Sequence, residues 1–327
     1  MCVALADPAE ALSDQMLVAV TLLVLYETVN FNSDDNLSSW DRHVDGALAL
    51  VELRGIGQLR NRIGRSIFLN LRTEVLVSCL QRWLDVPVTL TKWMNEARIF
   101  ESAKEVPAGR LAGIIVSTCA VLASVKERVV DKSTMSGCIS ALLSIDKALE
   151  RWAKSLTAEY GYKTTTIPEN YANAFLERHY SYSGIEIAHT WNLQRCARIT
   201  LRQALIETLS LHIGLPSFQS TLFSLSYREL LQTSDIIIQQ NSSDICYSVP
   251  YIFHYCDKPG RSGDMRAACI LSLLWPLYIA GTAHTTMSTS REWVVVQLKK
   301  IEEITGIQRA KSMALDIQKK SRDPPKA

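Results

Sequence analysis

The amino-acid sequence predicts an all-α protein, a large bundle of about ten or more helices around one buried core helix. Apolar residues recur at helical spacings of three and four along nearly the whole chain. Only 14 glycines occur in 327 residues, no hairpin dipeptide separates alternating strands, and strand and helix patterns do not alternate. Helices are therefore the expected main secondary structure.

The core helix is predicted at residues 267–283, AACILSLLWPLYIAGTA, a run of seventeen residues without a charge. A bilayer-spanning helix needs about 20 predominantly apolar residues, and this run is shorter and contains Ser272 and Pro276. We therefore expect it in a protein interior, with no membrane. The proline ring crowds the carbonyl of Ser272, so we predict a bend there and a ligand pocket beside it, bounded by Trp275 and Tyr278.

The other elements follow from caps and apolar spacing. Ser13 is the predicted N-cap of the first helix, and Gly55 ends the second. Thr289 and Glu292 form a predicted capping box, and Gly306 ends the helix that they begin. The predicted inward face of that helix consists of Val294, Leu298, Ile301 and Ile304. Helices are predicted over residues 16–26, 40–54, 64–87, 116–125, 136–156, 171–211, 227–240, 267–283, 289–305 and 307–317.

Three polar segments interrupt these helices. Residues 159–170 contain GYKTTTIPEN, a predicted loop where two halves of a single domain, residues 1–318, meet. Residues 241–244 are predicted to cap a separate short helix before Pro250. Residues 319–327, KKSRDPPKA, are predicted to be a disordered tail.

Composition and charge exclude several classes of protein. Thirty-five basic and 33 acidic residues give a formal net charge of +2, which provides no strong field for a phosphate backbone. The eight cysteines are scattered without a C-x-x-C motif, and the N-terminal residues lack a signal-peptide pattern. We therefore expect reduced thiols in an intracellular, reducing compartment.

No common cofactor or hydrolase motif occurs in the sequence, so no cofactor and no catalytic residue is predicted. His254 with Cys256 is the nearest approach to a metal-ligand spacing, and it does not predict a metal site. Tyr180 and Tyr182 either line a pocket or are ordinary loop residues.

An arginine stripe runs along one predicted helix. Trp191, Arg195, Arg198 and Arg202 share a face by their spacing. The stripe either forms salt bridges with acidic residues of neighbouring helices, which we favour, or binds a carboxylate or phosphate. The candidate ligand-pocket residues are Trp275, Tyr278, His284, Trp191 and Arg195.

Several blocks of the sequence, in order, resemble the regulatory domain of fungal zinc-binuclear-cluster (Zn2Cys6) transcription factors. The family's DNA-binding module contains six cysteines with C-x-x-C spacing, whereas here only Cys2 precedes Cys79. The resemblance therefore covers the effector domain alone, and no zinc ligand is carried over. The matching blocks are ALADPAEALSDQMLVAVTLLVLYE, SWDRHVDGALALVELRG, GRSIFLNLR, WNLQRCARITLR, SSDICYSVPY, LLWPLYIAG and the segment from REWV to TGIQRAKSMA.

The resemblance implies a nuclear regulatory domain that acts through protein partners, a second copy of the chain or a small-molecule inducer. With its own zinc cluster truncated or naturally lacking, the chain alone is expected to have no direct nucleic-acid binding. Two alternatives stay open. The chain is a recruited binding protein or cofactor-free cyclase or isomerase of fungal secondary metabolism, located in the cytoplasm, or it is an interaction module that competes with full-length relatives.

Overall fold

The computed structural model describes residues 12–29, 37–127, 132–166, 178–213, 221–256 and 269–322. It confirms the all-α prediction, because 83% of these residues are helical. They form twelve α-helices and one small two-stranded sheet. The chain divides into two compact units, Met1–Arg128 and Val129–Ala327. That division lies before residues 159–170, where we expected two halves of one domain to meet.

The first unit is entirely helical in its described part. Ser13 caps α3 as predicted, because its hydroxyl accepts a hydrogen bond from the Met16 amide at 3.1 Å. Gly55 ends α4 with a φ of 67°, a left-handed conformation that glycine adopts without strain. The elements are α3 (Asp14–Val29), α4 (Leu37–Arg54), α5 (Gly57–Arg60), α6 (Arg62–Arg82), α7 (Val88–Ala97), the 3-10 turn η1 (Arg98–Phe100) and α8 (Val106–Glu127).

Helix α8 is much longer than the predicted segment 116–125. It is also the one described helix that is long and apolar enough, by length and composition, to cross a membrane. Half of the most apolar 18-residue stretch of this helix is buried inside the protein. Helix α6 packs against α8 and α3, and its fully buried side chains include Phe68, Leu71 and Leu80. Helix α8 is thus an apolar helix of the first unit comparable to the core helix predicted at residues 267–283.

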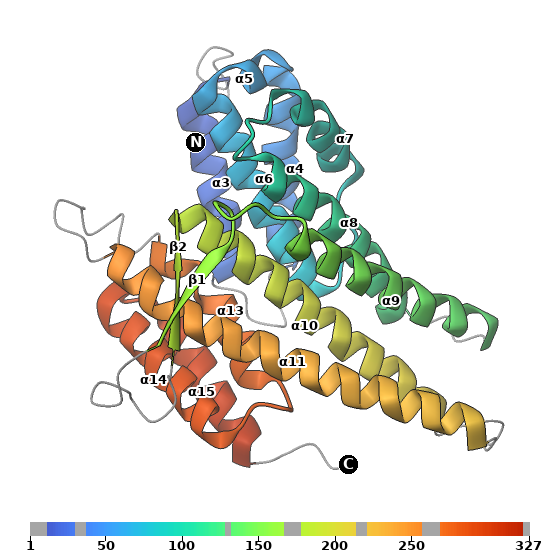
Figure 1. Cartoon of the computed structure of the whole chain (residues 1–327). Coiled ribbons are helices and arrows are strands. Elements are labelled where there is room, and N and C mark those ends of the chain that lie inside the picture. The colour runs from blue at the N-terminus through green and yellow to red at the C-terminus, as the bar shows by residue number, and fades with distance from the viewer. Residues whose placement is uncertain are drawn as a thin grey trace. The chain divides into compact units, whose positions relative to one another are not determined.

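The second unit is built on two long helices that lie side by side (Figure 1), α10 (Ile185–Ile213) and α11 (Thr221–Cys256). Helix α9 (Lys132–Lys154) packs on α10, and α13 (Leu274–Thr282) packs on α10 and α11. Helices α14 (Ser288–Thr305) and α15 (Gln308–Arg322) pack against each other and against α13.

A two-stranded antiparallel sheet replaces part of the predicted loop and part of the predicted helix 171–211. Strand β1 (Tyr162–Thr166) pairs with β2 (Arg178–Tyr182), and Tyr162 lies opposite Tyr182. The strands are rich in tyrosine and threonine, which fit the pleated surface of a sheet. Residues 171–177 of the predicted helix lie outside the described part, residues 178–184 are not helical, and the helical prediction holds from Ile185 onward.

Helix α11 is continuous through residues 241–244, so the predicted separate short helix is wrong. Of the side chains expected to act as a cap, that of Asn241 bonds to the preceding turn, as does that of Ser248 further along the helix. The Asn241 amide donates to the Ile237 carbonyl at 2.7 Å. The Ser248 hydroxyl donates to the Ile245 carbonyl at 2.6 Å. These polar residues form an internal face of α11, and Pro250 lies inside the helix.

The predicted single bent helix at residues 267–283 is two helical segments. Residues 267–268 lie outside the described part, residues 269–271 are helical, and a turn at Ser272 and Leu273 precedes α13. Pro276 thus lies in the first turn of α13, where an amide has no intrahelical partner in any case. The clash between Pro276 and the preceding turn is therefore avoided by an interruption of the helix and not by a bend.

Two details of the C-terminal helices differ from prediction. Helix α14 begins at Ser288 after Met287, with no side-chain hydrogen bond at the cap, so the capping box of Thr289 and Glu292 is wrong. Gly306 ends α14 in the left-handed region as predicted. Val294, Leu298 and Ile301 are buried, whereas Ile304 is 46% exposed.

Helix α15 continues to Arg322, so residues 319–322 of the predicted tail are helical and residues 323–327 lie outside the described part. Gly281 explains how closely the last helices approach α13. A β-carbon at this position would lie 2.7 Å from Cδ1 of Ile317 and 3.0 Å from Cγ1 of Val294. A larger residue at this position would require the Ile317 side chain to move.

Two arginines of the predicted stripe form the expected salt bridges with an acidic residue of α9. Nε of Arg198 lies 2.8 Å from Oδ1 of Asp146, and Arg202 bonds to the other carboxylate oxygen. Asp146 is almost fully buried, and these bonds hold its pKa below the usual value although burial alone would raise it. The break in the apolar pattern of α9 at Asp146 therefore marks a buried ion cluster.

We predict that Asp146→Asn lowers the free energy of unfolding by about 3–5 kcal/mol, because two guanidinium groups lose their buried counter-charge. Urea denaturation measures this difference. Glu150→Gln on the same helix is the control, since its ion pair with Lys154 is exposed and its loss should change stability by about 0.5 kcal/mol or less. Equal effects of the two substitutions would contradict the assignment.

Candidate functional site

Arg195 is the most unusual polar residue of the second unit. Its side chain lies on α10 and is only 1% exposed. Nη1 donates to the hydroxyl of Tyr182 and to Oδ1 of Asn192, each at 2.9 Å. Within the described part of the chain Nη2 has no hydrogen-bond partner, and no carboxylate forms an ion pair with this guanidinium. A buried cation is thus held by neutral groups, with donor capacity left unused.

Aromatic rings enclose the guanidinium. Its central carbon lies 5.1 Å from the ring centre of Tyr162, 5.2 Å from Tyr180 and 5.5 Å from Trp191. Each desolvated cation–π contact of this kind contributes on the order of 2 kcal/mol. The rings therefore replace part of the solvation that Arg195 loses on burial. We call Arg195, Tyr162, Tyr180, Tyr182, Trp191 and Asn192 the Arg195 cluster.

The fold brings these residues together from two strands and one helix. Residues 180 and 182 lie on one face of β2, because side chains of a strand alternate, and β2 packs on α11 and α10. Strand pairing then places Tyr162 of β1 opposite Tyr182. On α10, the spacing of three and four puts Trp191, Asn192 and Arg195 on adjoining positions of one face.

Helix α11 supplies a second layer around the cluster. The Tyr180 hydroxyl donates to Oδ1 of Asp244 at 2.7 Å, and the Asn192 amide donates to the Ser248 hydroxyl at 2.9 Å. The rings of Tyr247 and Tyr251 pack against Tyr180 and Tyr182.

Charge and burial oppose each other within the cluster. Burial raises the pKa of Tyr182, although Arg195 opposes this shift. Burial also raises the pKa of Tyr180, and Asp244 reinforces the effect. For Arg195, burial lowers the pKa, but Tyr182 and Asp244 outweigh it and leave the pKa above its usual value. The guanidinium is therefore charged and both phenols are neutral at physiological pH.

The structure brings together two of the five predicted ligand-pocket residues, Trp191 and Arg195. Trp275 packs instead against an apolar cluster that includes Ile199, Ile238 and Ile279. The Tyr278 hydroxyl donates to Oδ2 of Asp316 at 2.6 Å. His284 lies outside the cluster as well, 2.8 Å from Oδ1 of Asp235.

Tyr162 and Asn192 were missed by the sequence analysis. Tyr162 falls in a segment that we expected to be a loop, where no periodicity singled it out. Its strand could have been found from the β-branched run that follows it, residues 164–166. Tyr180 and Tyr182 were considered as pocket residues, and strand β2 places their side chains on the same face.

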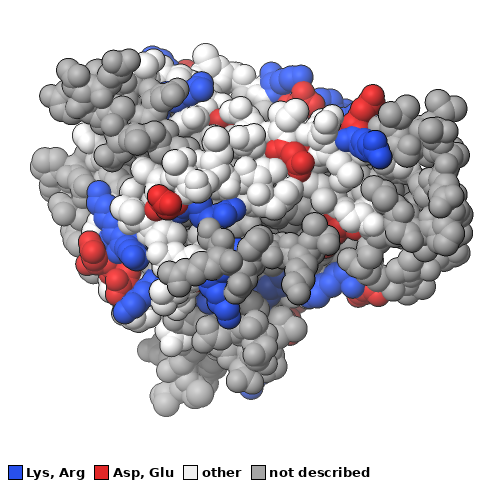
Figure 2. Space-filling model, turned by 90° about the horizontal axis from the view of Figure 1, so that it is seen from below, with Lys and Arg blue, Asp and Glu red and all other residues white. Residues whose placement is uncertain are grey.

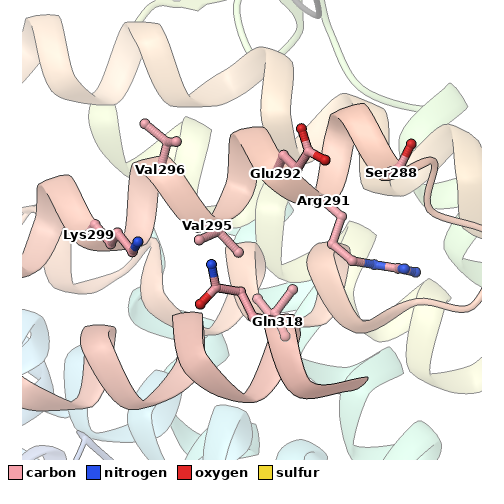
Figure 3. A pocket seen from close by; sticks show the side chains of 8 residues that line it. Ser288, Arg291, Glu292, Val295, Val296, Lys299 and Gln318 are labelled. Atoms are coloured by element: carbon pink, nitrogen blue, oxygen red, sulfur yellow. The ribbon is translucent and has the colours of Figure 1, made fainter. Parts of the chain in front are cut away.

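A cavity of about 240 Å³ lies between α14 and α15, away from Pro276. Figure 3 shows Val295 of α14 and Gln318 of α15 pointing toward one another in it. Its walls mix apolar and charged side chains, and none of the five predicted pocket residues contributes to it. The lining residues are Ser288, Arg291, Glu292, Val295, Val296, Lys299, Ile317 and Gln318.

Other chemistry in the described residues is limited. Six cysteines there are free thiols, and burial raises the pKa of Cys246 to about 12. No group of three or more potential metal ligands occurs among the residues that were described. His189 and Ser272 form a pair, with Nε2 2.8 Å from Oγ, but the Ser272 hydroxyl also bonds to the Cys269 carbonyl at 2.7 Å. This second bond occupies the serine proton, so the pair does not resemble an activated nucleophile.

In comparisons with known proteins, no family model, no curated protein and no solved structure matches this chain.

We predict that Tyr182→Phe lowers the free energy of unfolding by about 1.5–3 kcal/mol, because the charged Arg195 loses a buried hydrogen-bond acceptor. Chemical denaturation followed by circular dichroism measures the change. Tyr247→Phe is the matched control, since that substitution keeps a ring of the second layer; it should change stability by about 0.5 kcal/mol or less. A silent Tyr182→Phe would show that its hydroxyl does not support Arg195.

His189 should make the second unit sensitive to acid. Burial lowers the pKa of His189 to about 4, whereas an unfolded histidine titrates near 6.5, about the ordinary value. As pH falls, the unfolded chain therefore takes up the proton first, and stability decreases between about pH 6.5 and pH 4. His189→Gln should flatten this decrease in the melting temperature, while His254→Gln, on the exposed side of α11, should leave it intact. Identical pH profiles for His189→Gln and the parent chain would refute this.

Proposed function

We propose that the chain is a transcription-factor regulatory domain that lacks its own DNA-binding module. It acts in the nucleus through protein partners, including a second copy of the chain, and responds to a small-molecule inducer. This proposal rests on the resemblance of its sequence blocks to the regulatory domain of fungal zinc-cluster factors.

The packing of those blocks is the observation that supports the proposal best. Residues 191–202 and 242–251 are far apart in the sequence, yet they belong to the adjoining helices α10 and α11. The first block contains three members of the Arg195 cluster, and the second contains residues of the layer around it. Residues 274–281 of the next block belong to α13, which packs against α14 and α15, the helices that contain the last block. The resembling blocks of the second unit thus belong to one packed body, which supports their interpretation as parts of one domain.

The surface charge favours action through proteins. The formal net charge is +2, and on the face in Figure 2 the described basic side chains lie among acidic ones. The net charge and the described side chains of this face offer no extended basic field for a nucleic-acid backbone. The domain would therefore reach its target genes through a partner that binds DNA.

We predict that the chain changes transcription of a reporter gene when it is fused to a heterologous DNA-binding domain, relative to that DNA-binding domain alone. The regulatory surface would then be tethered without needing its own zinc cluster. In a mobility-shift titration, the chain without the fusion should show no salt-resistant preference for one DNA site. An unchanged reporter, or sequence-specific binding by the chain alone, would defeat the proposal.

A second candidate function is a recruited binding protein or a cofactor-free cyclase or isomerase of secondary metabolism, located in the cytoplasm. The observation that favours it is the convergence of Arg195 with the neutral phenols of Tyr180 and Tyr182, which could orient and polarise a substrate. Deletion of the gene would then cause an uncyclised or unisomerised precursor to accumulate, and the tethered reporter would stay unchanged.

A further inference from the structure

We propose that the Arg195 cluster is the inducer site and that it binds the carboxylate of an aromatic small molecule. In this proposal the aromatic ring of the ligand takes the position over the guanidinium that Tyr162 occupies in this structure. The inference rests on the proposed function, because it names the chemical class of the inducer and the residues that bind it.

The unused donor of Arg195 is the first step of the argument. Nη2 is buried and has no partner, and an unsatisfied buried donor is unfavourable. Both N–H groups of Nη1 are already used, so a carboxylate oxygen would accept a charge-assisted hydrogen bond from Nη2. A carboxylate is therefore the group that would satisfy both the charge and the free donor.

The chain does not supply that carboxylate from within the cluster. Asp244 is the nearest acidic residue of the second layer, and its Oδ1 already accepts from the Tyr180 hydroxyl at 2.7 Å and from the Gln240 amide at 2.8 Å. Asp146 is engaged by Arg198 and Arg202. The charge of Asp244 acts on Arg195 from a distance and raises its pKa, but no described acidic residue forms a direct ion pair with this guanidinium. A carboxylate in direct contact with Nη2 would therefore come from an external ligand.

The rings determine the class of molecule that would carry the carboxylate. Tyr180 and Trp191 present aromatic surface to Arg195 from β2 and α10, and Tyr162 does so from β1. The ring centre of Tyr162 lies 4.2 Å from that of Tyr180 and 5.0 Å from that of Trp191. An aromatic ligand in the same position would make the same contacts.

Tyr162 is also the ring that can leave most easily. It is only partly buried, and residues 163–166 of β1 are exposed. Strand β2 lies between β1 and the helices in the packing order, since β1 pairs with β2 and β2 packs on α11. Movement of Tyr162 would expose the guanidinium while the residues that hold Arg195 on β2 and α10 stay in place.

Isothermal titration of the full chain with 4-hydroxybenzoate, and with 4-hydroxybenzamide as its uncharged analogue, tests the proposal. We expect saturable binding of the acid and at least about tenfold weaker binding of the amide, because a charge-assisted hydrogen bond is lost. Arg195→Gln should weaken binding of the acid by at least about tenfold. Tyr162→Ala should strengthen it by about tenfold, because the competing ring is gone.

Two further variants keep the test decisive. Arg198→Gln removes a guanidinium of the same helix that is already paired with Asp146, and it should leave the affinity for the acid unchanged. Arg195→Lys keeps the charge and loses the planar fork, so it should also weaken binding. It serves in place of Arg195→Gln if circular dichroism shows that the latter does not fold.

Absence of binding in both the parent chain and Tyr162→Ala, equal affinity for acid and amide, or insensitivity to both Arg195 substitutions would overturn the proposal. The tethered reporter separates this failure from failure of the proposed function. A reporter that responds to the parent chain, together with no binding of the acid, sinks the inducer site alone. An unresponsive reporter with Arg195-dependent binding sinks the regulatory function and leaves the ligand site standing.

Discussion

The second unit depends on how α10 accommodates three guanidinium groups in the protein interior. Arg195, Arg198 and Arg202 occur at spacings of three and four, so one face of the helix brings all three toward its neighbours. Each charge would cost several kcal/mol if it were buried alone. Asp146 of helix α9 forms ion pairs with Arg198 and Arg202. The β1–β2 sheet instead places the Tyr162 ring and the Tyr182 hydroxyl against Arg195. The helix therefore fixes the position of both neighbouring elements.

The sequence could predict those parts of the fold that a local pattern marks. Apolar spacing and caps identify helices well where one face is buried and the ends are marked, as at Ser13, Gly55 and Gly306. The same patterns predicted that the helix ends before residues 241–244, whereas α11 continues through them. Polar side chains that bond to the preceding turn cannot be distinguished in the sequence from those of a cap. These patterns also missed β1, because a strand of five residues on a helical protein depends on its tertiary partners.

The candidate site was predictable only in part, for a related reason. The periodicity of α10 identified Trp191 and Arg195 as neighbours, since that relation is local. Tyr162 and Tyr182 reach Arg195 through strand pairing and through the packing of β2 on α11, neither of which is encoded in a local pattern. The residues predicted to form a pocket around Pro276 do not lie together, because the helix is interrupted before the proline. Tyr278 and His284 bond to Asp316 and Asp235 instead.

Arg202 and Arg195 differ in the partners that the chain provides for their charges. Both are buried arginines of the same helix, and seven residues, about two turns, separate them. Arg202 has a buried carboxylate, and such a pair needs nothing from outside the protein. Arg195 has rings and neutral acceptors, which are each worth on the order of 1–2 kcal/mol. Each of the two arginines leaves one buried donor without a partner, Nε in Arg202 and Nη2 in Arg195, so they differ in the ion pair alone. The direct carboxylate partner that Asp146 gives to Arg202 is therefore what the proposed ligand would give to Arg195.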